Sequence, residues 1–120
     1  MHKREEVDAA AKAAEQTHKR VAVVILWDNE DGNVDGLVVR KPNAQEYNQH
    51  ANRKTSVVVA AVGGDGGNFT ADDANYAAKL CVFPAPGEVN ALLDEYPGAV
   101  KRVIAAADYL AGGRKAAQGF

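Results

Sequence analysis

The clearest alternation of hydrophobic and polar positions lies near the C-terminal end. Apolar residues there recur at spacings typical of one face of an α-helix: Val100, Val103, Ile104, Ala107 and Ala111. Gly112 follows this stripe, at the point where a helix end often needs a positive φ. We therefore predict a helix that ends just before Gly112.

A shorter stripe precedes this helix and contains Val89, Leu92, Leu93 and Tyr96. Pro97 separates the two stripes, because a proline ends one helix and can begin the next. We predict two short helices joined at Tyr96-Pro97-Gly98 that fold onto each other. Their shared apolar side would face partly the core and partly a partner.

The N-terminal part of the chain has a different pattern. Residues 3–20 predict a helix whose apolar side is mostly alanine, which favours helix but buries little area. Light packing on its own domain is the favoured interpretation, and contact with another protein is the alternative. The continuous β-branched run 21–27 predicts a buried strand, and 37–40 predicts a second. The Asp-Gly turns between them predict an antiparallel hairpin.

The middle of the chain is less regular. Asn43 and Glu46 have the spacing of a capping box, which predicts a helix to about residue 52. Residues 57–62 fit either a strand or a buried helical turn, and the glycine-rich stretch 63–67 fits a flexible connector. Thr70 with Asp73 predicts another helix, extending to about residue 82.

Together these elements predict an α+β fold. A small two- or three-stranded antiparallel sheet near the N-terminus is followed by a mainly helical C-terminal half. A chain of 120 residues fits one modest core. We assign residues 21–113 to a single domain, 1–20 to an N-terminal helical arm and 114–120 to a C-terminal tail.

Composition narrows the classes of partner. Lys and Arg number 14 against 16 Asp and Glu, a balance that argues against a dedicated nucleic-acid binder. No apolar run approaches the ~18 residues of a membrane helix, and the N-terminus lacks the pattern of a signal peptide. The single cysteine cannot form an intrachain disulfide and fits a reducing compartment. We expect no nucleic-acid partner and no membrane partner.

Candidate metal ligands occur at one place. Asp31, Asn33 and Asp35 resemble the opening of a calcium-binding EF-hand loop. The twelfth position of such a loop needs a bidentate carboxylate, and Pro42 stands there. A hairpin turn is therefore the preferred interpretation, and we expect no metal and no cofactor.

Catalytic patterns fail in the same way. The glycines at 63–67 lack the Lys and Ser or Thr of a phosphate-binding loop. Cys81 has no histidine near it in sequence and continues an alanine-lined helical face, so a buried structural thiol is favoured. The three histidines lack metal-ligand spacing, and Trp27 fits the edge of the core. We expect no enzymatic activity.

Several short motifs in order carry a family resemblance. They are a strand, an acidic Asp-Gly turn, a second strand, Lys41-Pro42 with Glu46-Tyr47, Cys81-Val82-Phe83-Pro84, and Leu92-Leu93-Asp94-Glu95-Tyr96-Pro97-Gly98 before a last amphipathic helix. Over residues 21–113 the chain resembles the small tail assembly chaperones and related assembly proteins of tailed bacteriophages. This resemblance implies a non-catalytic protein that coats a tape-measure-type protein while tail subunits assemble around it.

The resemblance leads to expectations about partners and place. Partners would be other phage structural or tape-measure-type proteins within an oligomeric assembly, in the host cytoplasm during assembly or in the virion. The candidate partner-binding residues are Val89, Leu93, Val100, Ile104, Tyr109 and Phe120. The alternative is a structural component of the virion, in the tail, neck or capsid, whose terminal arms contact neighbouring subunits.

Overall fold

The computed structural model describes residues 2–51 and 71–112. Its sheet is built around β3 (Asn33–Arg40), which pairs antiparallel with every other described strand. β2 (Val21–Asp28) lies along one edge of β3. The short strands β1 (His2–Lys3) and β4 (Cys81–Phe83) share the other edge, because β1 pairs with the start of β3 and β4 with its end.

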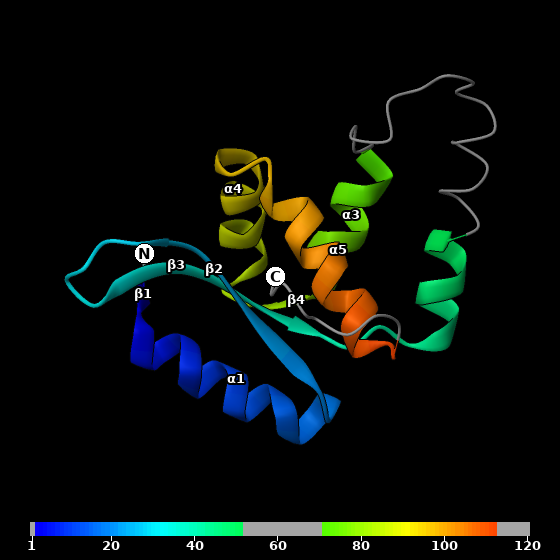
Figure 1. Cartoon of the computed structure of the whole chain (residues 1–120), viewed down its shortest axis with the longest axis horizontal. Helices are drawn as coiled ribbons and strands as arrows, with labels where there is room; N and C mark the ends of the chain where they lie inside the picture. The colour runs from blue at the N-terminus through cyan, green and yellow to red at the C-terminus, as the bar shows by residue number, and fades with distance from the viewer. Residues whose placement is uncertain (1, 52–70, 113–120) are drawn as a thin grey trace.

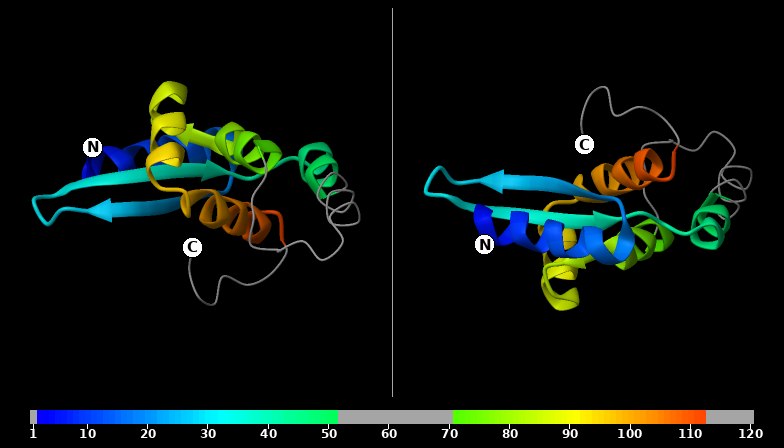
Figure 2. Two further views of the ribbon diagram at one scale, coloured as in Figure 1. Left: turned by 90° about the horizontal axis from the view of Figure 1, so that it is seen from above. Right: turned by 90° about the horizontal axis from the view of Figure 1, so that it is seen from below.

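Helices cover both faces of the sheet (Figure 1). α1 (Arg4–His18) lies across one face. α3 (Ala71–Leu80), α4 (Pro86–Glu95) and α5 (Ala99–Leu110) lie on the other, as the views from above and below show (Figure 2). The backbone is also helical over residues 44–51. The predicted α+β class is confirmed, with an antiparallel sheet followed by a helical C-terminal half.

The larger core lies between the sheet and helices α3 to α5. Alternate positions of β2 and β3 point into it, and the fully buried side chains include Val24, Leu37, Leu80 and Val103. Burying several large aliphatic side chains, at roughly 1.5–3 kcal/mol each, is the main stabilising contribution here. The two predicted C-terminal helices pack together as expected, and Gly112 has a φ of +87° after the second.

α1 contributes a smaller core on the opposite face. Val7 and Ala11 pack against Val34 and Val38 of β3. Gly36 permits this close approach, because a Cβ there would meet Ile25 Cδ1 at 3.1 Å and Val7 at 3.5 Å. Residues 4–18 thus pack on their own sheet, as the favoured interpretation held, rather than extending from it.

Two predicted boundaries are corrected, and one strand is new. β3 begins at Asn33 rather than at residue 37, so the turn between the strands is short. α3 ends at Leu80, and residues 81–83 form β4 where a continued helix was expected, because they pair with the exposed edge of β3. β1 was not anticipated from two residues. The predictions for 52–70, including the alternatives for 57–62, lie outside the described residues.

The outer edge of β2 is covered in part by a side chain of α5. The backbone N–H of Lys41 donates to the carbonyl of Arg20, so alternate residues from Arg20 onward point their backbone groups toward β3. The backbone N–H and C=O groups of Val21, Val23 and Ile25 consequently point away from β3, toward the outer edge. Arg102 Nη1 donates to the carbonyl oxygen of Ile25 at 2.7 Å.

Within residues 2–51 and 71–112, no helix has the length and apolar character needed to cross a bilayer.

A candidate binding groove beside α4

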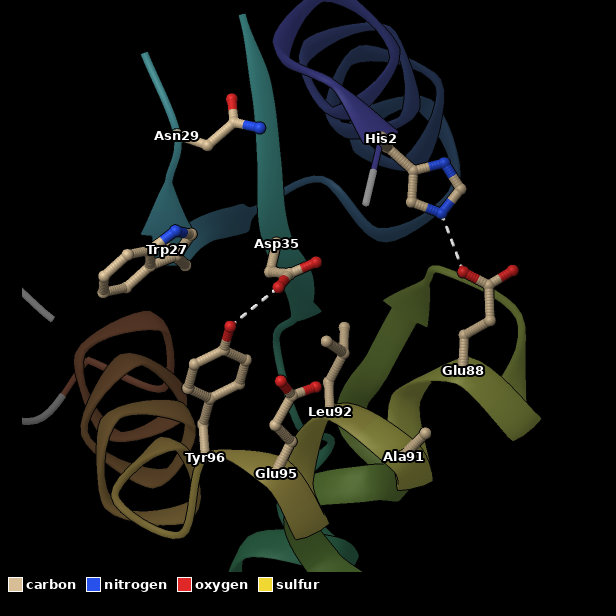
Figure 3. A pocket seen from close by; sticks show the side chains of 9 residues that line it. All are labelled: His2, Trp27, Asn29, Asp35, Glu88, Ala91, Leu92, Glu95 and Tyr96. Carbon is tan, nitrogen blue, oxygen red and sulfur yellow. Dashed lines mark hydrogen bonds and ion pairs between the residues drawn. The ribbon is translucent and has the colours of Figure 1, made fainter. Parts of the chain in front are cut away.

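A hollow of about 600 Å³ lies between the β2–β3 hairpin and α4. We call it the α4 groove. Its walls come from distant parts of the sequence: His2 from β1, Trp27 and Asp35 from the hairpin, and Glu88 to Tyr96 from α4 and its end (Figure 3). Such a hollow, walled by several chain segments, is a place where a ligand or a partner side chain can enter.

A bulge in the sheet brings Trp27 into the groove. Pairing along β2 and β3 places Ile25 opposite Gly36 and then Trp27 opposite Asp35, so the register shifts by one residue between them. Without that shift Trp27 would lie opposite Val34, whose side chain packs toward α1. A bulge of this kind re-aims a side chain. Here it leaves Trp27 58% exposed on the α4 side of the hairpin.

Tyr96 and Asp35 join the end of α4 to the sheet. The Tyr96 hydroxyl donates a hydrogen bond to Asp35 Oδ2 at 2.8 Å (Figure 3). This bond to a carboxylate raises the pKa of Tyr96 to about 12, because the neutral hydroxyl is the form that donates. The contact keeps a nearly buried carboxylate beside the ring of Tyr96.

The other end of the groove is closed by an ion pair. The imidazole Nε2 of His2 lies 2.8 Å from a carboxylate oxygen of Glu88, and its Nδ1 lies 3.3 Å from Glu6. The hydrogen bond to Glu88 is the largest cause of the raised pKa of His2, and it outweighs the opposing desolvation. The protonated imidazole is therefore the form that this end of the groove favours.

The charge of the lining is mainly negative. Asp35, Glu88 and Glu95 contribute carboxylates, and His2 is the one basic side chain among the lining residues. Ala91 and Leu92 supply an apolar wall between the two ends (Figure 3). The groove thus combines an aromatic face, an apolar wall and carboxylates, which suits a partner side chain that is both apolar along its length and positively charged.

Most of the predicted partner-binding residues lie in the core. Val89, Leu93, Val100 and Ile104 are all in the buried cluster between the sheet and the helices. This places them on the core side of the predicted apolar surface, where a partner has no access in the folded chain. Tyr109 is 43% exposed, and its role in partner binding stays a prediction. Phe120 lies outside the described residues.

The calcium candidates do not converge. Asp31 lies in the exposed turn, where its backbone N–H donates to the Asn29 side chain. Asn33 begins β3, and Asp35 points to Tyr96. In the part of the chain that the structure describes, no three side chains of His, Cys, Asp or Glu come together as metal ligands would.

Cys81 takes a different position from the one predicted. It lies on β4 opposite Val39 instead of on a helical face. Burial raises the pKa of its thiol to about 12, so the thiol stays protonated at neutral pH. This agrees with a structural thiol packed against the main core.

Two features escaped prediction. Trp27 was expected at the edge of the core, and the bulge that exposes it has no signal in the sequence. His50 was not singled out by the sequence, yet it is buried and lies 2.8 Å from Asp73. The four-residue spacing of Glu46 and His50 places both on one helical face and was the available clue.

Comparison of the chain with models of protein families, with curated proteins and with solved structures found no match.

Proposed function

We propose that this chain is a non-enzymatic bacteriophage assembly protein, similar to tail assembly chaperones, that acts by binding other proteins. Its partners would be tape-measure-type or other phage structural proteins, bound in the host cytoplasm before the particle is complete. The proposal starts from the order of short motifs along residues 21–113. The α4 groove supplies the surface.

The exposed position of Trp27 beside the groove is the structural observation that best supports this proposal. Trp27 is the largest exposed apolar side chain of the described residues, and it borders a groove rather than standing alone. Tryptophan is enriched among the residues that dominate protein–protein binding energy, especially beside a pocket. A chain that leaves its single tryptophan in this position is well suited to hold a partner.

The motif residues themselves support the scaffold. Glu46 and Asn43 cap the helix at 44–51 with reciprocal hydrogen bonds of 2.8 and 3.0 Å. Tyr96 fixes the end of α4 to the sheet through Asp35. Residues of the motifs therefore help to hold the helical half on the sheet, and the α4 groove that we propose as the binding surface lies between the hairpin and α4.

The alternative is a structural component of the virion with terminal arms. That proposal relies on the N-terminal helix to reach a neighbouring subunit. α1 buries Val7 and Ala11 against its own sheet, so little of its apolar side is left for a neighbour. We therefore prefer the chaperone-like function.

A capture experiment tests the preferred function. The chain would be coexpressed with the tape-measure-type protein of the same phage, and the soluble complex would be measured after affinity purification. We expect Trp27→Ala to reduce capture at least tenfold, as a central aromatic anchor would. Tyr109→Asp is the matched comparison, because it changes an exposed aromatic residue on α5, outside the α4 groove.

The outcomes separate the surfaces and the functions. Loss of capture with Tyr109→Asp alone would move the interface to α5, and no capture by the unaltered chain would reject the proposal. Circular dichroism of both variants shows whether the fold is kept. Quantitative mass spectrometry of purified particles then distinguishes the alternative, because a chaperone should be absent from them and a virion component present at a fixed copy number.

A further inference from the structure

The α4 groove is asymmetric in charge, and this asymmetry points to the chemistry of what it binds. Three of its lining side chains are carboxylates, against one histidine that is already engaged by Glu88. Asp35 likewise accepts from Tyr96. Glu95, in the last turn of α4, is exposed and adds a carboxylate near the aromatic end of the groove (Figure 3).

Two aromatic side chains, Trp27 and Tyr96, lie at the same end of the groove as this carboxylate (Figure 3). Trp27 reaches the groove from β2, and Tyr96 from the end of α4 (Figure 3). A guanidinium group stacks on the face of a tryptophan and at the same time donates in-plane hydrogen bonds to a carboxylate. Ala91 and Leu92 offer an apolar wall for the methylenes of such a side chain.

We propose that the α4 groove binds an arginine side chain carried by an extended segment of a protein partner. Trp27 stacks on the guanidinium, and Glu95 accepts its hydrogen bonds. This inference rests on the proposed function, since it names the partner chemistry that the same surface recognises. An apolar segment without a positive charge would leave the exposed carboxylate of Glu95 unpaired at the interface, which disfavours it.

The protein contains its own reporter for this binding. Trp27 is the one tryptophan in the chain, so the whole tryptophan emission comes from the groove. The probe is the peptide acetyl-Gly-Leu-Arg-Leu-Gly-amide, titrated into the full-length chain. The matched peptide replaces arginine by citrulline, which keeps the shape and removes the charge. We expect saturable quenching or shift of the emission with the arginine peptide and about tenfold weaker binding of the citrulline peptide.

Adjacent carboxylates on α4 supply the control. Glu95→Gln should raise the Kd of the arginine peptide about tenfold, because one charge-assisted contact is lost. Asp94→Asn removes the same charge from the neighbouring exposed residue, which does not line the groove, and should change the Kd less than about twofold. Higher salt should weaken the arginine peptide and leave the citrulline peptide unaffected.

Several results would overturn the inference. Equal affinity for the two peptides would remove the charge argument, and equal effects of Glu95→Gln and Asp94→Asn would remove the assigned carboxylate. Emission that depends on protein concentration without peptide would show that a second copy fills the groove. If the unaltered chain captures the phage partner while Glu95→Gln captures it equally well, the proposed function stands and this inference fails. If the chain binds the arginine peptide but does not capture the phage partner, the groove binds arginine and the proposed function fails.

Discussion

Glu46 shows how much one side chain can hold together. Its carboxylate receives two hydrogen bonds from the guanidinium of Arg40, at 2.9 and 2.8 Å, and lies 3.2 Å from the ammonium of Lys79. It also accepts from the backbone N–H of Asn43. The Arg40 contact is the main reason that the pKa of Glu46 falls to about 2, against an opposing effect of burial.

The lowered pKa leads to a prediction about pH. Because the folded-state pKa lies below the unfolded value of 4.5, Glu46 stabilises the fold above pH 4.5, and this stabilisation is lost as the pH falls toward 2. Glu46→Gln should lower the free energy of unfolding by about 2 kcal/mol at pH 7. The difference from the unaltered chain should shrink in urea titrations between pH 4.5 and 2.

The exposed residue Glu15 on α1 provides the control for that experiment. Glu15→Gln should change stability by less than about 0.5 kcal/mol at every pH. If Glu46→Gln lowers the free energy of unfolding by the same amount down to pH 2, the charge of Glu46 is not the cause. The packing of its side chain would then account for the loss of stability.

At this scale the sequence was informative about local contacts. The spacing of Asn43 and Glu46 predicted the capping box that the structure contains, because both residues lie within one helical turn. The partner Arg40 was not predictable in the same way. Its approach depends on the path of the chain through residues 41–43, between β3 and the helix, which a residue pattern does not encode.

Between elements, the most telling contact joins the helix at 44–51 to α3. The imidazole of His50 lies 2.8 Å from Asp73 Oδ1, and its ring stacks on Tyr76 with centroids 4.0 Å apart and an interplanar angle of 4°. All three residues are buried. The contact connects two helices that flank residues 52–70 in the sequence.

Removal of the imidazole should therefore be costly. We expect His50→Ala to lower the free energy of unfolding by about 3 kcal/mol, because it removes the hydrogen-bond partner of buried Asp73 and the ring that stacks on Tyr76. Urea denaturation followed by circular dichroism measures the change. Gln49→Ala, at the exposed neighbouring position, should cost less than about 0.5 kcal/mol. Similar losses for the two variants would show that the pair contributes little.

Long elements with a clear hydrophobic pattern were predicted from the sequence, and the two short strands β1 and β4 were not. The continuous apolar run of β2 and the period of α5 both reflect burial along a whole element. β1 and β4 contain two and three residues, and they exist because β3 offers them an edge. A pattern cannot show such pairing, since it arises only after the chain has folded.

At the scale of the whole molecule, the outer edge of β2 determines whether the sheet can pair with another chain. It presents backbone groups of Val21 and Val23 away from β3, and among described residues no strand pairs with it. An apolar edge of this kind can pair with another chain. Arg102 donates a hydrogen bond to the carbonyl oxygen of Ile25 at one end of this edge. Fewer backbone groups of β2 are therefore left to pair with a strand of another chain.

We predict that loss of this arginine promotes self-association. Arg102→Ala should increase the weight-average mass at high protein concentration, as measured by sedimentation equilibrium. Lys101→Ala, at the exposed preceding position, removes the same charge and should leave the mass unchanged. If both variants behave like the unaltered chain, Arg102 has no protective role at this edge.

The position of His2 has a practical consequence for work with this protein. Because β1 pairs with β3 and His2 lines the α4 groove, a segment added at the N-terminal end is attached close in sequence to a residue of this groove. A polyhistidine purification tag at that end would carry partial positive charge near neutral pH and would resemble the cationic ligand that we propose. Such a tag could fill the groove of its own molecule, so binding should be measured after the tag has been cleaved.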